Sequence, residues 1–412
     1  MSSTLTSQNM AQEYPQKVSV TLLGIAQIIS WGTLYYSFPQ IAEAVQEEFG
    51  WIKSDVYGAL TLGLLLSATA AIPTGMLIDK GYGRRVMTIG SIAAGAIFIL
   101  GSMIESLIGF YLVFASIGLL QAATLYDAAF AVVARAVDTS QTKKTITTLT
   151  LWGGFASTVF IPFIEFLLTT LNWREVLVVI GLINVFLCAG IYSRLPQKAA
   201  QSTQTVSMAS KPKSRQGVRW AIQQPMFWAL FLCFLFFYGT TTAFSFHLYP
   251  LLIEKGLSIV EVVAFLAILG PSQVAGRLIL FAFSHRISMA KLGISIAALL
   301  PLVFASLAYL PGNFWALVPL AILFGAINGT MTIVKGTAVP EFLTPSSYGA
   351  INAAMGVPVK VIKALSPSLA AMLWVMTNSY DSLLNILMFL GAGSAIFFYW
   401  ASRLHSSSTN NI

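Results

Sequence analysis

A series of long apolar blocks constrains this chain more than any other feature of its sequence. Blocks such as 18–38 and 221–246 approach the ~20 residues with which a helix crosses the ~30 Å hydrocarbon layer of a bilayer. Only 9% of the residues are charged, against roughly 25% in a soluble domain. The blocks are also unbroken, whereas the strands of a membrane barrel alternate in polarity. The sequence therefore predicts an all-α membrane protein with twelve transmembrane helices. We expect them near 18–38, 56–78, 86–104, 108–133, 146–168, 176–194, 222–246, 258–283, 288–310, 313–334, 348–374 and 382–402.

The longest polar stretch divides the twelve blocks into two sets of six. Similar residues recur in the two halves at an offset of 205 or 206 positions: Asn172 and Asn378, Asp79-Lys80 and His285-Arg286, and Pro162 and Pro367. This echo predicts two pseudo-symmetric six-helix bundles, an architecture that places a substrate site between the repeats. The expected organisation is an N-terminus over 1–17, a first bundle over 18–194, a linker over 195–221, a second bundle over 222–403 and a tail over 404–412.

The basic residues of the loops predict the orientation in the membrane. Most of the 23 Lys and Arg residues fall in the loops and tails on the side of the termini, whereas the opposite loops hold only Lys53, Arg174 and Lys255. Since basic loops stay in the cytoplasm, both termini and the linker are expected there. Short loops and the absence of a cleavable signal in the first 16 residues favour a multi-pass protein of the bacterial inner membrane.

Several function classes find no support in the sequence. The net charge of +8 is spread thinly over short loops, which does not favour nucleic-acid binding. Cys188 and Cys233 lie inside apolar blocks and indicate neither a disulfide nor a metal cluster. No phosphate-binding GxxxxGK[ST] loop is present, and the three histidines lie near loops or ends. We therefore expect no metal, no cofactor and no enzymatic activity, and any transport would draw on an ion gradient.

The loop between the second and third blocks carries the most specific motif. It reads Gly75-Met-Leu-Ile-Asp79-Lys80-Gly-Tyr-Gly83-Arg84-Arg85. This segment resembles the signature loop of the major facilitator superfamily, with Lys80 where Arg is usual. Asn172-Trp173-Arg174 and Asn378-Ser379-Tyr380 resemble further motifs of that superfamily. The resemblance implies the major facilitator fold, transport by alternating access, and a gating role for Gly75, Asp79, Lys80, Gly83, Arg84 and Arg85 on the cytoplasmic side.

The eighth block narrows the resemblance. Gly270-Pro-Ser-Gln273-Val-Ala-Gly276-Arg277 resembles the eighth helix of the monocarboxylate and oxalate/formate branch, in which an arginine binds the substrate carboxylate. Two departures concern proton coupling. Gln273 stands where animal members have an aspartate, and the first block lacks their lysine.

Charged residues inside the predicted helices are candidates for function, because an ionised side chain at the bilayer centre costs at least roughly 2.5 kcal/mol. Arg277, Asp127, Lys360 and Lys363 are such residues, and the two lysines share one helix face. One hypothesis is that Arg277, helped by Lys360 or Lys363, binds an organic anion while Asp127 carries a proton. The alternative is a structural ion pair between Arg277 and Asp127, with the lysines extending along their helix towards water.

Aromatic and amide side chains complete the predicted site. Gln273, Tyr126, Gln121, Tyr35, Tyr238 and Asn328 lie in the blocks that line the cavity in this superfamily, and each can orient a small ligand. His247 and Trp51 are interpreted instead as anchors at the membrane interface.

Three functions remain open at this stage. The first is proton-coupled transport of a small, monocarboxylate-like anion by a monomer in the lipid bilayer. The second is proton-antiport efflux of an amphipathic compound, for which 28 Phe and 13 Met residues would provide an apolar cavity. The third, a transporter-like receptor or sensor, is disfavoured by the absence of a predicted soluble domain.

Overall fold

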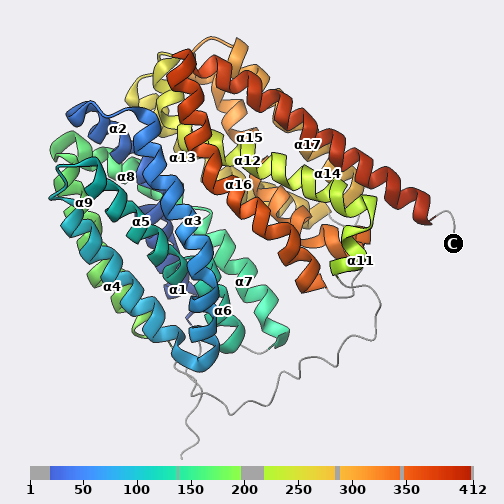
Figure 1. Cartoon of the computed structure of the whole chain (residues 1–412), viewed down its shortest axis with the longest axis horizontal. Coiled ribbons are helices and arrows are strands. Elements are labelled where there is room, and N and C mark those ends of the chain that lie inside the picture. Colours follow the sequence, from blue (N-terminus) through green and yellow to red (C-terminus); the bar gives the residue numbers. More distant parts are fainter. Residues whose placement is uncertain (1–18, 137–138, 196–217, 284–287, 344–347, 410–412) are drawn as a thin grey trace, which may run out of the picture.

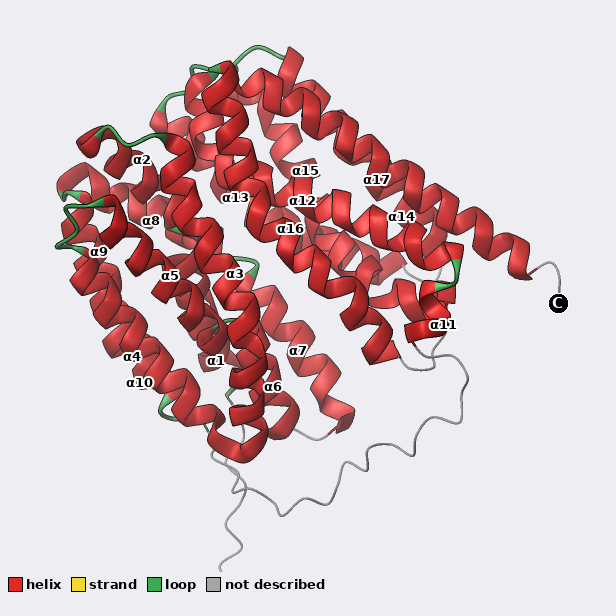
Figure 2. Cartoon of the chain, in the orientation of Figure 1, coloured by secondary structure: helices red, strands yellow, loops and turns green. Residues whose placement is uncertain are grey.

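The computed structural model describes residues 19–136, 139–195, 218–283, 288–343 and 348–409. Across these residues the secondary structure is helical and includes no strand (Figure 2). In this described part of the chain, eleven helices are long and apolar enough to cross a membrane. The first span completes the predicted twelve. It consists of three successive helical segments whose junction residues Gly32 and Ser37 keep right-handed helical dihedral angles.

The spans have the following bounds. The first six are α1 (Val20–Trp31) with η1 (Gly32–Tyr36) and α2 (Phe38–Phe49), α3 (Lys53–Leu77) with η2 (Ile78–Tyr82), α4 (Gly83–Gly101), α5 (Leu107–Thr124) with α6 (Tyr126–Ala136), α7 (Thr139–Gly153) with α8 (Ala156–Thr170), and α9 (Trp173–Leu182) with η3 (Ile183–Cys188) and α10 (Ala189–Tyr192). After the short α11 (Val218–Ile222) come α12 (Pro225–Glu254), α13 (Ile259–Phe283), α14 (Met289–Tyr309), α15 (Phe314–Ala338) with η4 (Val339–Leu343), α16 (Tyr348–Thr377) and α17 (Tyr380–Thr409).

The helices form two bundles that lie side by side (Figure 1). The interface pairs α3 with α16 and α8 with α13. These are the second span with the eleventh and the fifth with the eighth, so exchanging the halves of the chain converts one pair into the other. We call the end of the molecule where α10 ends and α11 begins the linker face, and the end where α2 gives way to α3 the far face (Figure 1).

Each bundle has its own apolar core, and large apolar side chains also cover the outside. Phe38, Phe98 and Phe110 are buried in the first bundle, and Phe234 and Phe304 in the second. On the outer surface Met376, Trp315 and Phe389 are each more than 70% exposed. Lipid tails are as apolar as these side chains, so an exposed apolar surface is stable in a bilayer and close backbone packing holds the helices together.

Four irregularities interrupt the described spans of the first bundle, and one of them is the π-helical η3 in the sixth span. The π-helical η1 lies within the first span. Leu125, with ψ −164°, breaks the fourth span between α5 and α6. A turn at Gly154 and Phe155 separates α7 from α8. Discontinuous helices are typical of transport sites because they free backbone groups at the level of the cavity.

Two of the predicted domain boundaries differ from the structure. The predicted linker, 195–221, lies mostly outside the described residues, but α11 begins within it at Val218. The predicted tail, 404–412, is helical as far as Thr409 because α17 continues beyond the apolar segment into Ser406, Ser407 and Ser408. Hydropathy marks where a helix leaves the apolar layer and does not mark where its hydrogen bonding stops.

Candidate functional site

A cavity of about 320 Å³ lies between the two bundles. The first bundle contributes residues of α1, η1, α3, α5 and α6, and the second contributes residues of α12 and α16. Its lining residues are Trp31, Tyr35, Leu64, Ser67, Ala68, Gln121, Ala122, Leu125, Tyr126, Asp127, Phe130, Thr242, Lys360, Lys363 and Ala364. Six of the predicted site residues are therefore brought together, and they come from segments more than 200 positions apart.

Asp127 and Lys360 face each other across this cavity. The Lys360 Nζ atom lies 3.3 Å from the Asp127 carboxylate, so this ion pair joins α6 to α16. The Asp127 side chain is 64% exposed and the Lys360 side chain is 50% exposed, which shows that water reaches them between the bundles. Screening by that water makes the pair a weak and separable contact.

Arg277 does not form the ion pair with Asp127 that one interpretation of the sequence predicted. Its Nη1 atom donates to the Thr150 carbonyl at 2.8 Å, across the bundle interface, and its Nε atom donates to the Gly329 carbonyl at 3.2 Å. The alternative of a structural Arg277–Asp127 pair is therefore wrong for this structure, in which Lys360 is the partner of Asp127. Sequence gives the depth of a charge along its helix but not the direction in which the side chain points.

Lys335 is a neighbour of the site that the sequence did not reveal. It lies in the last turn of α15, where a basic residue resembles a cytoplasmic anchor. Its Nζ atom lies 4.7 Å from the ring centre of Tyr238, and the Nζ atom of Lys363 lies 5.6 Å from the same ring. The Tyr238 ring thus holds two ammonium groups from two helices, an arrangement that cation–π attraction stabilises.

The first bundle faces these cations with aromatic rings. The ring centres of Trp31 and Tyr35 are 5.2 Å apart, and those of Trp31 and Tyr126 are 4.9 Å apart. Tyr126 in turn stacks on Phe130 at 4.9 Å with an interplanar angle of 14°. The broken spans position this wall, because Tyr35 belongs to η1 and Tyr126 follows Leu125. We call Trp31, Tyr35, Tyr126 and Phe130 the aromatic wall.

Gly153 allows the ring of Tyr126 to sit where it does. A Cβ atom at Gly153 would overlap the Tyr126 hydroxyl, which donates to the nearby Thr150 carbonyl at 3.4 Å. The same carbonyl accepts from Arg277. Tyr126 and Arg277 therefore meet at one backbone oxygen, so the guanidinium adjoins the cavity that Tyr126 lines.

The three predicted amides have different surroundings. Gln121 lines the cavity while its Nε2 atom donates to the Leu34 carbonyl at 2.7 Å, which fixes α5 to η1. Gln273 and Asn328 do not line the cavity. A Cβ atom at Gly329 would overlap the backbone of Gln273, so this part of α13 packs closely against α15. Asn328 is half-buried on α15.

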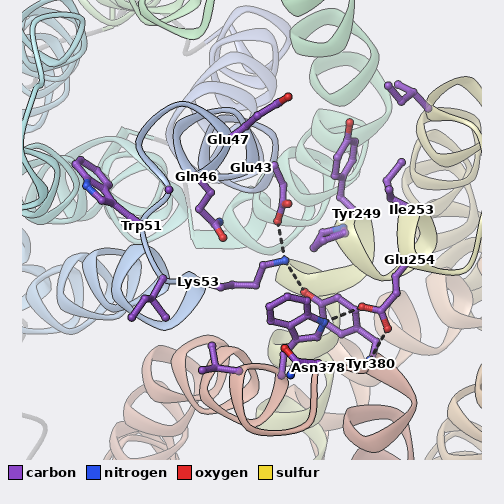
Figure 3. A pocket seen from close by; sticks show the side chains of 16 residues that line it. Glu43, Gln46, Glu47, Trp51, Lys53, Tyr249, Ile253, Glu254, Asn378 and Tyr380 are labelled. Atoms are coloured by element: carbon purple, nitrogen blue, oxygen red, sulfur yellow. Dashed lines mark hydrogen bonds and ion pairs between the residues drawn. The ribbon is translucent and has the colours of Figure 1, made fainter.

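On the far face the two bundles are joined by polar contacts around a second hollow of about 770 Å³ (Figure 3). Lys53 on α3 is 8% exposed and lies 3.1 Å from the Glu43 carboxylate. It also donates to the Tyr380 hydroxyl of the second bundle at 3.3 Å. Glu254 accepts from the Trp374 indole and from the Tyr380 backbone, each at 2.7 Å. We call Glu43, Lys53, Glu254, Trp374 and Tyr380 the far-face gate.

A second layer of contacts lies beneath the far-face gate. The hydroxyls of Thr61 and Ser368 are 2.6 Å apart, and Ser368 also donates to the Tyr57 carbonyl at 2.9 Å. The Tyr57 hydroxyl donates to the Phe246 carbonyl at 3.0 Å. These bonds join α3 to α16 and α12, so the bundle interface is closed at this level.

His247 belongs to this layer and is fully buried; its interpretation as a membrane-interface anchor was wrong. Its Nε2 atom lies 2.8 Å from the Pro367 carbonyl, and its Nδ1 atom lies 3.0 Å from the Tyr380 hydroxyl. A carbonyl only accepts, so Nε2 carries the hydrogen. Tyr380 can then donate to Nδ1 while it accepts from Lys53. Trp51, the other predicted anchor, stacks on Phe49 at 4.5 Å beside the far-face hollow.

The signature loop forms a tight turn between α3 and α4. Gly81 has φ +93°, a left-handed conformation that favours glycine. Gly75 lies within α3, before the turn. Gly83 is packed against Val132 of α6, where a Cβ atom would be too close. Lys80 and Arg85 are exposed, Arg84 is half-buried, and Arg85 lies 5.9 Å from the Tyr82 ring centre. The side chain of Asp79 lies outside the described part.

Comparisons with known proteins agree with this architecture. The family model of the Major Facilitator Superfamily matches residues 23–367. A bacterial homologue of the human lysosomal transporter Spinster, solved in an inward-facing and unoccupied conformation, is similar with a TM-score of 0.72 and 15% identity over 94% of this chain and 97% of that one. The nucleoside transporter NupG gives a TM-score of 0.72 and 11% identity over 93% of this chain and 98% of that one. No curated protein matches the sequence.

Proposed function

Because the chain belongs to the major facilitator superfamily, a family of transporters, we propose that it moves a small organic anion across the membrane by alternating access. The observation that carries this proposal is the set of cations beside the central cavity. Lys360 and Lys363 line it, and Arg277 adjoins it across the Thr150 carbonyl. An anion is the ligand that such groups bind most strongly, and a cavity between two repeats is where transporters place it.

The contrast between the two ends of the interface supports alternating access. At the far face, buried hydrogen bonds join α3 to α12 and α16. Towards the linker face the ribbons of the two bundles diverge (Figure 1), and Asp127 and Lys360 are more than 45% exposed. Both observations support a form in which a ligand enters from the linker face. Transport requires the far-face gate to open while the linker face closes.

The proposed membrane orientation places the linker face in the cytoplasm. Lys80, Arg85 and Lys291 are exposed at that end, and basic residues are retained on the cytoplasmic side. The cavity then opens inward in this structure. A single chain supplies both bundles and the whole cavity lining, so we propose that the monomer is the transporting unit.

Proton coupling is assigned to Asp127. Its carboxylate pairs with Lys360 and is open to water. Protonation of Asp127 would remove the partner of Lys360 and leave that ammonium free to attract the anion. Proton binding and anion binding would then favour each other, which is the requirement for coupled transport.

A second candidate is efflux of an amphipathic compound, and the aromatic wall favours it. The wall provides an apolar surface from the first bundle in the cavity that the lysines of the second bundle also line. Such a compound would bind through the wall, and its binding would depend little on Arg277.

Uptake into proteoliposomes under an imposed pH gradient separates the two candidates. We expect labelled organic anions to accumulate with the native protein and uptake to be lost in Arg277→Ala, because the carboxylate loses its charged partner. Lys291→Ala is the matched control, since Lys291 lies at the start of α14 away from the cavity. Undiminished anion uptake by Arg277→Ala would overturn the proposal and favour amphipath efflux.

A further inference from the structure

More positive charge surrounds the central cavity than one acid group would neutralise. Among the described residues the salt bridges of the chain are Lys53–Glu43, Arg174–Glu48, Lys255–Asp381 and Lys360–Asp127. Of the four cations in or beside the cavity, only Lys360 therefore forms a salt bridge with a described carboxylate. Arg277, Lys335 and Lys363 meet carbonyl oxygens or the Tyr238 ring instead.

Cations without a counter-charge between membrane helices are energetically unfavourable, because one at the bilayer centre costs at least roughly 2.5 kcal/mol on insertion scales. Such charges are retained where a ligand supplies the opposite charge. A ligand with a single acid group would leave two of the three cations without a counter-charge, whereas a ligand with two acid groups would leave one.

The three cations fall into two groups on different helices. Lys335 of α15 and Lys363 of α16 share the Tyr238 ring, at 4.7 and 5.6 Å from its centre. Arg277 of α13 is held instead by the carbonyls of Gly329 and Thr150, the latter shared with Tyr126. Two separately held cationic groups fit two acid groups on one molecule.

The aromatic wall lines the same cavity as Lys363 and comes from the first bundle. Its rings form a continuous series from Tyr35 through Trp31 and Tyr126 to Phe130, with neighbouring ring centres 4.9 to 5.2 Å apart. A flat ring gains offset-stacked or edge-to-face contacts on such a surface, worth about 0.5–1.5 kcal/mol per pair. A flexible aliphatic chain gains no such contact.

From this arrangement we infer that the substrate is a planar, ring-containing anion with two acid groups. One group is bound by Lys335 and Lys363, the other by Arg277, and the ring lies against the aromatic wall. The inference rests on the proposed function and makes its substrate class specific. The inferred substrate has two acid groups and so differs from the monocarboxylate that the resemblance of the eighth span implied. The second acid group is assigned to the cationic group that Lys335 and Lys363 form together.

Three simple acids test the inference with the full-length protein in proteoliposomes. Isophthalate has a ring and two carboxylates, benzoate has the ring and one carboxylate, and adipate has two carboxylates on a flexible chain. We expect isophthalate to be taken up, and to raise the melting temperature of the detergent-solubilised protein, at concentrations about tenfold or more below those needed for benzoate, since each added charged contact contributes about this factor. Adipate should also need higher concentrations than isophthalate, because its flexible chain gains no stacking contact on the aromatic wall. Equal potency of benzoate would overturn the two-charge requirement, and equal potency of adipate would overturn the ring.

Lys335→Gln tests whether Lys335 and Lys363 bind one of the two acid groups. We expect it to lower the preference for isophthalate over benzoate by about tenfold, and Lys335→Arg, which keeps the charge, to restore much of it. Lys291→Gln is the control and should leave the ratio unchanged. If Lys335→Gln does not fold, Lys363→Gln tests the same binding group. A loss of the preference for isophthalate over benzoate in Lys363→Gln supports the group, and an unchanged preference contradicts it.

The outcomes also separate this inference from the proposed function. Uptake of benzoate equal to that of isophthalate, unaffected by either lysine substitution, refutes the two-acid substrate and leaves anion transport standing. Failure of all three acids to bind or to be taken up refutes anion transport itself.

Discussion

The two halves of the bundle interface use charged and polar side chains in opposite ways. At the far face Lys53 is almost buried and contacts both Glu43 and Tyr380, and Glu254 accepts two hydrogen bonds. In or beside the central cavity, Arg277, Lys335 and Lys363 form no salt bridge with a described carboxylate.

This difference distinguishes structural charges from ligand-binding charges. A charge whose partner is part of the protein stabilises the conformation in which the two meet, and the far-face gate does so for the closed far face. A charge without such a partner is available to a ligand that brings the opposite charge. Four substitutions test this distinction, from the largest expected effect to the smallest.

Arg277→Ala should have the largest effect. It removes the guanidinium that joins the bundles at Thr150 and that we assign to the substrate. Truncation of one partner of a desolvated charge pair costs about 2–5 kcal/mol, so anion uptake should fall at least roughly 30-fold. Initial rates in proteoliposomes measure this, and Arg277→Lys, which keeps the charge but loses the fork of donors, should retain an intermediate rate.

Asp127→Asn should separate coupling from binding. The amide keeps the shape of the side chain but cannot carry the coupling proton, so accumulation driven by a pH gradient should fall about tenfold or more. Exchange of labelled for unlabelled anion without a gradient should persist, because Lys360 keeps its charge. Unchanged proton-driven accumulation would remove Asp127 from the coupling mechanism.

Tyr380→Phe should weaken the far-face gate. It removes the hydroxyl that lies between Lys53 and His247 and leaves the buried His247 Nδ1 atom without its donor. An unsatisfied buried acceptor costs about 1–3 kcal/mol, which favours opening of the far face. Labelling of Ser368→Cys by a membrane-impermeant maleimide from the far side should speed up by roughly fivefold or more. Equal labelling rates with and without Tyr380→Phe would show that this hydroxyl does not hold the gate.

Trp374→Phe should have the smallest effect. It removes the indole hydrogen bond to Glu254 but keeps an aromatic face near the Lys53 ammonium, which lies 4.5 Å from the indole ring centre. The bond is exposed, so its net contribution is at most about 1 kcal/mol. In the same labelling assay we expect a change of less than roughly fivefold. An effect larger than that of Tyr380→Phe would reverse the order of the two contacts.

The apolar blocks predicted the fold well because hydrocarbon permits few ways to satisfy a backbone. Twelve spans and two bundles follow from the block lengths and from the echo between halves, and the family model agrees. The first span was predicted as 18–38, but helical structure continues through α2 to Phe49, since Gln46, Glu47 and Glu48 favour a helix without being apolar.

The site was predicted less completely, for three physical reasons. Lys335 looks like an anchor from its position along α15, and only the arrangement of helices shows that it lies over Tyr238. Leu125 breaks the fourth span although neither Gly nor Pro marks the position. The partner of Asp127 depends on the direction in which each side chain leaves its helix, which hydropathy does not record.

Likewise, the sequence marked Lys53 only as a basic residue of a loop, and Tyr380 only as part of a motif. Their contact joins residues 327 positions apart, which no local pattern reveals. Long-range contacts between bundles therefore required the structure, whereas the bundles themselves did not.

A disulfide across the closed layer tests the central claim most directly. Thr61 and Ser368 lie on opposite bundles with hydroxyls 2.6 Å apart, so Thr61→Cys with Ser368→Cys should form a disulfide on oxidation. We predict that the oxidised protein in proteoliposomes still binds an anion from the linker face but does not transport it, and that reduction restores transport. Full transport by the oxidised protein would show that the far face does not need to open, and would contradict the assignment of gate and ligand site to the two halves of the interface.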